Sequence, residues 1–196
     1  MDAHIASQFN NQLPKPDKRS DSSISIISSI PSDPQIISVT EKKSKSVLPL
    51  ILYWSYDYRH TSTLNSAIGV NNFRKTIYQQ ANKLKQKLNG RKLELVVEQI
   101  PGSFAIVDKG AILLFFIHWD KLYVEPDPKD MNISYRVLQN GVEAKSGKIT
   151  LVNIAKNRSI RFAQSWKSSA SEFLVQYNLD IIEMTKTVID KLIVEL

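Results

Sequence analysis

The sequence predicts an α+β domain in which two helices pack on one face of a mainly antiparallel sheet of about four to six strands. Three features lead to this prediction: runs of alternating apolar and polar residues, two longer stretches with apolar residues at helical spacing, and an Asn-Gly pair between two alternating runs. The predicted order of elements is β-α-β-β-β-β-α. With 196 residues, of which 42% are hydrophobic, the chain is long enough to build one such core.

The first 46 residues differ in composition from the rest of the chain. They contain 11 serines and four prolines, and Phe9 is their only aromatic residue. Such a segment buries too little apolar area to offset the entropy of ordering, so we expect a tether over residues 1–46 and a single domain over residues 47–196. Two apolar patches among the serines also suit an extended segment that adds to a sheet edge. The first patch consists of Ile24, Ile26, Ile27 and Ile30, and the second of Ile36, Ile37 and Val39.

The domain is predicted to begin with a strand over residues 48–60. Alternation along this strand places Trp54, Tyr56, Tyr58 and His60 on one face. Aromatic side chains on a strand most often pack under a helix or against neighbouring strands. If they are exposed instead, the same row offers rings for contact with a protein, a glycan or a nucleic-acid base.

Two helices are predicted, over residues 71–89 and 170–193. Asn71 or Asn72 can cap the first, which Gly90 follows, while Ser169 and Glu172 have the spacing of a capping box for the second. Apolar residues at helical spacing define the face that each helix buries. These residues are Phe73, Ile77, Leu84 and Leu88 in the first helix, and Phe173, Leu174, Tyr177, Ile181, Met184, Val188 and Leu192 in the second.

Further strands are predicted between the two helices, beginning with residues 93–100. We interpret Lys109-Gly110 as the turn of a hairpin that joins residues 104–108 to residues 111–125. Asn140-Gly141 is a type I′ turn signal and predicts a second hairpin that ends near Val152.

No pattern in the sequence predicts catalysis, a metal site or a cofactor site. The chain has no cysteine, and its three histidines, His4, His60 and His118, form no metal-binding pair. It also lacks the nucleophile elbow GxSxG and the phosphate-binding patterns GxxxxGK[ST] and GxGxxG. We therefore predict that the protein has no catalytic residue and no cofactor and is not an enzyme. The remaining alternative is an enzyme whose active-site residues are dispersed along the sequence.

The net charge of +7 leaves nucleic-acid binding as an alternative function. The predicted helix at 71–89 carries Arg74 and Lys75 and has a basic face, and a basic face beside stacking rings is typical of such proteins. The speculative binding residues are Trp54, Tyr56, Tyr58, His60, Arg74 and Lys75. The longest apolar run, residues 111–117, is far shorter than the roughly 20 residues that a spanning helix needs.

A serine- and proline-rich tether ahead of one small α+β domain resembles a mature lipoprotein of the bacterial cell envelope. The order of elements over residues 47–196 is similar in outline to the amino-terminal domain of Tol-B and to lipoprotein activators of wall synthesis. The resemblance implies a periplasmic or outer-membrane-anchored domain, held by a lipidated cysteine where Met1 stands here, followed by Asp2. It matches no motif residue by residue, so it assigns no functional residue.

We therefore expect a non-enzymatic, tethered envelope protein that binds a protein partner through a sheet edge or the aromatic strand. On this hypothesis the chain reaches a membrane only through a lipid anchor that it does not itself carry. The alternatives are a cytoplasmic, basic domain that binds nucleic acid, and the enzyme with a dispersed site.

Overall fold

The computed structural model describes residues 21–31, 38–47, 53–113, 117–161 and 164–196, which form two sheets and three helices. The sheet with strand order β1-β4-β7-β8 is called sheet A, and the sheet with order β2-β3-β5-β6-β9 is called sheet B. The strands are β1 (Ile24–Ser28), β2 (Ser38–Val47), β3 (Tyr53–Thr63), β4 (Lys92–Gln99), β5 (Ser103–Leu113), β6 (Ile117–Pro126), β7 (Met131–Gln139), β8 (Val142–Leu151) and β9 (Arg158–Ser159). The helices are α2 (Ser66–Gln79), α3 (Ala81–Leu88) and α4 (Trp166–Glu195).

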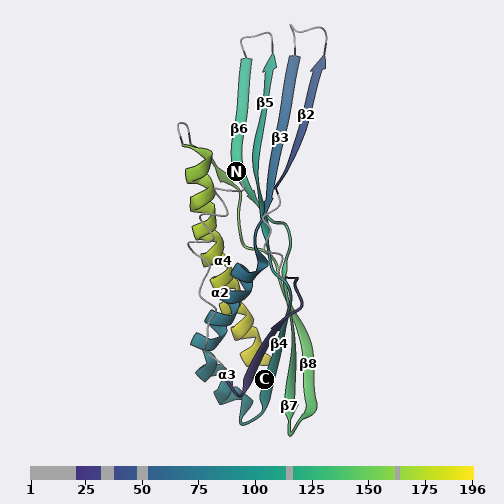
Figure 1. Cartoon of the computed structure of the whole chain (residues 1–196), viewed down its shortest axis with the longest axis vertical. Helices are drawn as coiled ribbons and strands as arrows, with labels where there is room; N and C mark the ends of the chain where they lie inside the picture. Colours follow the sequence, from purple (N-terminus) through teal and green to yellow (C-terminus); the bar gives the residue numbers. More distant parts are fainter. Residues whose placement is uncertain (1–20, 32–37, 48–52, 114–116, 162–163) are drawn as a thin grey trace.

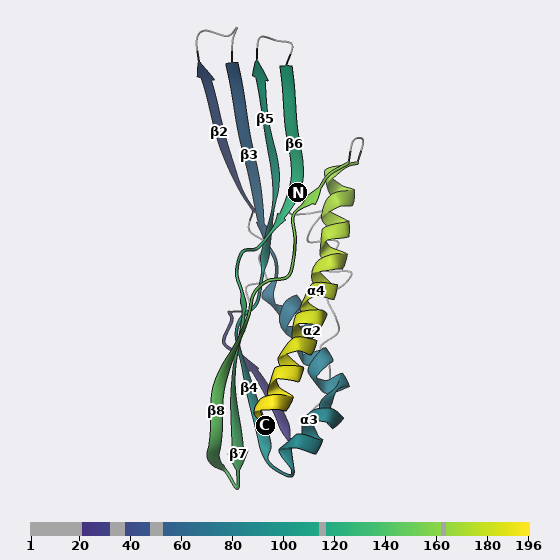
Figure 2. The ribbon, with the colours of Figure 1, turned by 180° about the vertical axis from the view of Figure 1, so that it is seen from behind.

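The helices all lie on one face of sheet A, which confirms the predicted α+β fold class (Figures 1 and 2). Pairing is antiparallel throughout the described residues except between β1 and β4. The apolar stripes predicted for the helices are buried in one core. Alternate residues of sheet A, such as Leu93, Leu95 and Val97 of β4, supply the other side of that core because successive strand residues point to opposite faces.

Part of the segment expected to be a tether belongs to the sheets. Ile24 and Ile26 of β1 enter the core and are 1% and 9% exposed, because β1 pairs in parallel with β4 at the edge of sheet A. Residues 38–47 form β2, which pairs with β3 in sheet B. The boundary expected at residues 46 and 47 is thus corrected for residues 24–28 and 38–47, while residues 1–20 and 32–37 lie outside the described part of the chain.

The two predicted hairpin turns have different outcomes. Asn140 and Gly141 have φ of 52° and 82°, as a type I′ turn requires, and they join β7 to β8 as predicted. The prediction of a turn at Lys109-Gly110 is wrong, because β5 continues through both residues to Leu113. Gly110 is needed there for a close contact rather than for a turn, as the next subsection describes.

The helix boundaries also differ from the prediction. The first helical region starts at Ser66, where the side chain of Asn65 accepts a hydrogen bond from the amide of Ala67, and it is divided into α2 and α3 at Gln80. The prediction of a capping box at Ser169 is wrong, because α4 begins at Trp166. The N-cap is Ser165, whose hydroxyl accepts a hydrogen bond from the amide of Ser168. The 30 residues of α4 span about 45 Å, enough to cross sheet A and reach the base of sheet B.

Buried polar contacts hold the junction between the two sheets. The hydroxyl of Tyr177 in α4 donates to the carbonyl of Pro101, at 2.7 Å, and burial raises the pKa of this tyrosine far above its ordinary value. The carboxylate of Asp127, which is also buried, accepts hydrogen bonds from the amides of Gly102 and Lys129. These contacts tie α4, the loop before β5 and the end of β6 together, so they set the direction in which sheet B leaves the core.

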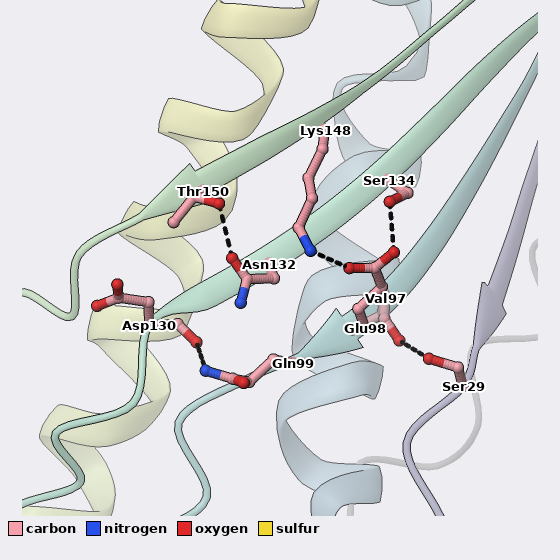
Figure 3. A network of polar contacts seen from close by, with 9 residues as sticks. All are labelled: Ser29, Val97, Glu98, Gln99, Asp130, Asn132, Ser134, Lys148 and Thr150. Atoms are coloured by element: carbon pink, nitrogen blue, oxygen red, sulfur yellow. Dashed lines mark hydrogen bonds and ion pairs between the residues drawn. The ribbon is translucent and has the colours of Figure 1, made fainter.

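The outer face of sheet A is polar (Figure 3). Glu98 of β4 accepts a hydrogen bond from Ser134 of β7 and forms an ion pair with Lys148 of β8, at 2.6 Å. Arg136 and Glu94 form a second cross-strand ion pair. Because these groups are partly exposed, each pair contributes little to stability, and the face is best explained as a solvated surface.

The outer parts of β2, β3, β5 and β6 extend beyond the helices as a four-stranded sheet, here called the arm (Figure 1). The arm comprises residues 41–47, 53–59, 107–113 and 117–123. At its base, Phe104 of β5 contacts Phe173 of α4 with ring centroids 4.7 Å apart. The first turns of α4 continue past this contact, where Ala170 is still buried, and the outer part of the arm extends beyond the end of the helix (Figure 2). Among the described residues, this outer part depends on its own cross-strand contacts.

We predict that Ile24→Ala lowers the free energy of unfolding by about 2–5 kcal/mol, because it leaves a cavity under a fully buried side chain. Ile27→Ala, on the opposite face of the same strand, is the control: Ile27 is 52% exposed, and we expect a loss of less than about 1 kcal/mol. Urea denaturation of the two variants measures both values. Equal losses would contradict the place of β1 in the core.

Candidate functional site

The strongest candidate for a functional site is a row of aromatic side chains on one face of β3. Trp54, Tyr56 and Tyr58 lie on this face because they are alternate residues of the strand. Their ring centroids are 5.1 Å apart from Trp54 to Tyr56 and 5.6 Å apart from Tyr56 to Tyr58, and neighbouring rings are tilted. Trp54 remains 41% exposed. These rings therefore form a continuous, partly exposed surface on the arm, here called the aromatic face.

Gly110 of β5 allows the central ring to lie flat on the sheet. Gly110 is the cross-strand neighbour of Tyr56, and a Cβ atom at this position would lie 2.5 Å from the Tyr56 ring. Only glycine permits this approach without a shift of the ring. The contact fixes the orientation of Tyr56 and, through the ring contacts, that of its two neighbours.

Charged and apolar side chains surround the aromatic face. In one cross-strand row, Lys42, Tyr58, Asp108 and Leu122 are neighbours on β2, β3, β5 and β6. The ammonium group of Lys42 lies 5.3 Å from the centre of the Tyr58 ring, in a cation–π contact. Leu122 is 37% exposed on the other side. The surface thus has an apolar centre with a cation at one edge.

Two carboxylates, Asp108 and Asp120, lie next to the Tyr56 hydroxyl. This hydroxyl donates a hydrogen bond to Asp108. Partial burial raises the pKa of Asp108 above its ordinary value, and the negative charge of Asp120 raises it further, whereas the hydrogen bond from Tyr56 acts in the opposite direction. The pKa of Tyr56 is raised mainly by burial and also by these two carboxylates. The site therefore offers hydrogen-bond acceptors beside the rings.

The two histidines of the domain have different surroundings. Nδ1 of His60 lies 2.6 Å from the hydroxyl of Thr40, while Nε2 is buried without a hydrogen-bond partner in the described part of the structure. His118 is exposed near the start of β6. Among the described residues, no three of the histidine, aspartate and glutamate side chains gather closely enough to hold a metal ion.

The opposite face of the arm is charged. Asp57 pairs with Lys109 at 3.0 Å, and Arg59 pairs with Glu125 at 2.8 Å. With Glu41 and Lys43, three of these residues (Asp57, Arg59 and Lys109) line a shallow polar hollow of about 290 Å³. Because its charges are largely compensated within the sheet, this face is less suited than the aromatic face to a specific contact.

The structure brings together four of the six residues suggested by the sequence. Trp54, Tyr56, Tyr58 and His60 share one face of β3 as predicted. Arg74 and Lys75 lie instead on α2, against sheet A, and the guanidinium of Arg74 donates to the carbonyl of Ile26 in β1. They do not belong to the aromatic face.

Four further residues of this surface were not predicted: Lys42, Asp108, Asp120 and Leu122. They come from β2, β5 and β6, and only the strand register places them beside the rings. A glycine within an otherwise alternating run, at position 110, was the one available signal, since such a glycine often marks close packing of a side chain.

Comparisons with known proteins add no relative: no family model, no curated protein and no solved structure matches the chain. In the described residues, none of the helices combines the length and apolar character that crossing a membrane requires. The function is therefore inferred from the protein's own geometry.

We predict that Gly110→Ala displaces the Tyr56 ring, because the added methyl group would occupy its position. The expected results are a weaker near-ultraviolet circular dichroism signal and a loss of about 1–3 kcal/mol in the free energy of unfolding. Gly102→Ala is the matched control, since its new Cβ would meet its nearest neighbour, the Ile100 carbonyl oxygen, at an ordinary 3.6 Å. An unchanged aromatic signal in Gly110→Ala would show that the ring does not depend on Gly110.

We predict that Asp120→Asn lowers the pKa of Asp108 towards its ordinary value, because it removes a neighbouring negative charge. Carbon-detected NMR titration of the carboxyl groups measures this change. A raised pKa favours the protonated form in the folded protein, so the stability linked to Asp108 is present below its unfolded pKa and is lost as the pH rises through its folded value. In the Asp120→Asn variant, the pH dependence of the free energy of unfolding should therefore change together with the pKa of Asp108. If the pKa of Asp108 is the same in the variant and the native protein, the two carboxylates are not coupled.

Proposed function

We propose that the chain is a non-enzymatic binding protein that attaches to a protein partner through the aromatic face of its arm. The observation that carries this proposal is the row of Trp54, Tyr56 and Tyr58 on a part of the sheet that the described helices leave uncovered. Tryptophan and tyrosine are the residues that most often dominate the binding energy of protein interfaces.

The composition of the surface around the rings supports a protein partner. Leu122 extends the apolar centre, while Lys42, Asp108 and Asp120 supply charges of both signs near its border. An apolar aromatic centre with a polar rim is typical of protein–protein contacts. The rings are held in place by Gly110 and by each other, so little side-chain entropy is lost on binding.

The aromatic face of the arm is a better candidate for the binding surface of a protein partner than the edge strand β2. β2 is the outermost strand on one side of sheet B in the described structure, and its sequence carries Lys42, Lys43 and Lys45. Lysines on an edge strand disfavour pairing with another strand because the added chain would bury or crowd their charges. Addition of a partner strand at β2 is therefore the less favoured mode.

Nucleic-acid binding through the basic helical region has less support. Several of its cations have partners within the protein: Lys85 forms an ion pair with Asp21, and Arg91 donates to the carbonyls of Leu88 and Leu196. Contact with phosphates would compete with these interactions. The envelope location, the lipid anchor and the absence of enzymatic activity stay predictions.

We predict that a photo-reactive amino acid placed at Leu122 crosslinks to a discrete partner protein in cells that express the full chain. Val175 on α4, which is 54% exposed, is the matched control position and should give no discrete product. Adding Tyr58→Ala to the Leu122 probe should reduce the crosslinked fraction about tenfold, because a buried interface tyrosine contributes roughly 1–2 kcal/mol or more. Equal crosslinking at both positions, or a product insensitive to Tyr58→Ala, counts against the proposal.

A further inference from the structure

Two carboxylates, those of Asp108 on β5 and Asp120 on β6, belong to the aromatic face of the arm. The register pairs Tyr56 with Gly110 and Gly110 with Asp120, and residues paired across a sheet point to the same face. Asp108 lies two residues before Gly110 on β5 and therefore shares this face. Lys109, which stands between them in the sequence, points to the opposite, charged face, where it forms its ion pair. The rings and the two carboxylates thus form one surface.

The hydroxyl end of the Tyr56 side chain lies next to both carboxylates. A Cβ atom added to Gly110 would lie 2.5 Å from Cζ and from the hydroxyl oxygen of Tyr56, so this end of the ring crosses over Gly110. Asp120 follows Gly110 in the same cross-strand row, and the Tyr56 hydroxyl donates a hydrogen bond to Asp108. Both negative charges therefore lie beside the central ring of the aromatic face.

The negative charges of Asp108 and Asp120 are not compensated by a cation of the described chain. Asp120 is exposed and Asp108 is partly buried. Among the described residues, neither of them forms an ion pair. The pKa of Asp108 is raised by burial and also by the charge of Asp120, as expected for two carboxylates that share a site. The aromatic face differs in this respect from the opposite face, where the carboxylate of Asp57 has a cationic partner.

A cation of the protein itself already contacts one ring of this face. The ammonium group of Lys42 lies 5.3 Å from the centroid of the Tyr58 ring, within the roughly 6 Å over which a cation–π contact is effective. In the part of the chain that the structure describes, no such cation lies over Tyr56. The ring beside both negative charges is therefore suited to a cation that another molecule supplies.

We propose that the aromatic face recognises an arginine side chain of its protein partner, an inference that rests on the binding function proposed above. The guanidinium group stacks on the rings of Tyr56 and Trp54 and donates hydrogen bonds to Asp108 and Asp120. A guanidinium is planar, stacks on aromatic faces and carries several N–H donors, so it satisfies the rings and the carboxylates together. Hydrogen bonds between a guanidinium and a carboxylate are roughly twice as strong as those between neutral groups.

Other charged ligands match this surface less well. The rings lie in a row along one strand, with neighbouring centroids 5.1 and 5.6 Å apart, and so do not form a cage around a quaternary ammonium group. Such a group also has no N–H to donate to the carboxylates. A lysine supplies a compact point charge that lacks the planar, stacking shape of a guanidinium. The phosphates of a nucleic acid would be repelled by the two negative charges.

The test uses the full chain in low-salt buffer, with the peptide acetyl-Leu-Arg-Leu-amide as the probe. In amide NMR spectra, we expect the peptide to shift the signals of Tyr56, Gly110 and Asp120. The same peptide with citrulline in place of arginine keeps the shape of the side chain without its charge and should bind at least about tenfold more weakly. A peptide with lysine at this position should also bind more weakly than the arginine peptide, because an ammonium group does not stack.

The chain that carries both Asp108→Asn and Asp120→Asn tests the role of the carboxylates. It keeps the shape of both side chains and removes their charges, so we expect the arginine peptide to bind at least about tenfold more weakly. Asp57→Asn is the matched control, because it is the same substitution on the opposite face of the arm, and it should leave the affinity unchanged. Cooperative unfolding in urea establishes that each variant is folded.

A second measurement reports on the native chain and needs no substitution. A positive charge beside Asp108 favours its ionised form, so a saturating amount of the arginine peptide should lower the pKa of Asp108 in a carboxyl NMR titration. The citrulline peptide should leave this pKa unchanged. Because the linkage is reciprocal, the affinity for the arginine peptide should fall as the pH falls through the pKa of Asp108.

Absence of amide shifts, equal binding of the arginine peptide and either control peptide, retained binding by the doubly substituted chain, or an unchanged pKa of Asp108 overturns the arginine proposal. Its failure is distinct from that of the proposed function, because crosslinking at Leu122 reports on any protein partner. Crosslinking that persists in the doubly substituted chain leaves a protein partner that does not use this arginine contact. Binding of the arginine peptide without a crosslinked product leaves the arginine site and removes the support for the partner.

Discussion

The apolar surface that the helices bury against the sheets is the interaction on which the rest of the structure depends. The contact of Phe104 with Phe173 packs α4 against the base of sheet B, and the hydrogen bond of Tyr177 with Pro101 fixes the loop from which β5 starts. Inside this boundary the side chains are buried in one core. Outside it the same strands continue without a covering layer among the described residues, and this division places the candidate functional surface on the arm.

The arm is stabilised by cross-strand pairs in place of a helix-covered core. The Asp57–Lys109 and Arg59–Glu125 ion pairs lie on one face, and the ring contacts over Gly110 lie on the other. Such pairs contribute roughly 0.2–1 kcal/mol each, so the arm is expected to be less stable than the core and to owe its rigidity to their number. A weakly stabilised but pre-ordered sheet suits a binding role, because its aromatic side chains are exposed and already oriented.

The two faces of the arm differ in chemistry. The charged face compensates its own charges, whereas the aromatic face has an apolar centre with a polar border.

The sequence by itself determined the features that depend on local spacing. Helical periodicity identified the buried residues of α4, such as Ile181 and Met184, and the Asn140-Gly141 pair identified its turn, because positive φ angles are tolerated there. Alternation along β3 likewise placed Trp54, Tyr56 and Tyr58 on one face. The sequence also lacks cysteine and the known catalytic patterns, which favours the hypothesis of a binding protein.

Only the tertiary structure decided which strands are neighbours. β1 enters the core because it pairs with β4, which lies more than sixty residues away in the sequence. The Tyr56 ring packs on Gly110 because β5 pairs with β3 in this register. The placement of Asp108, Asp120 and the level ends of four strands follows from the same pairings. Strand pairing joins residues with no local relation, and its register depends on the whole set of side chains buried together, so local spacing alone does not determine it.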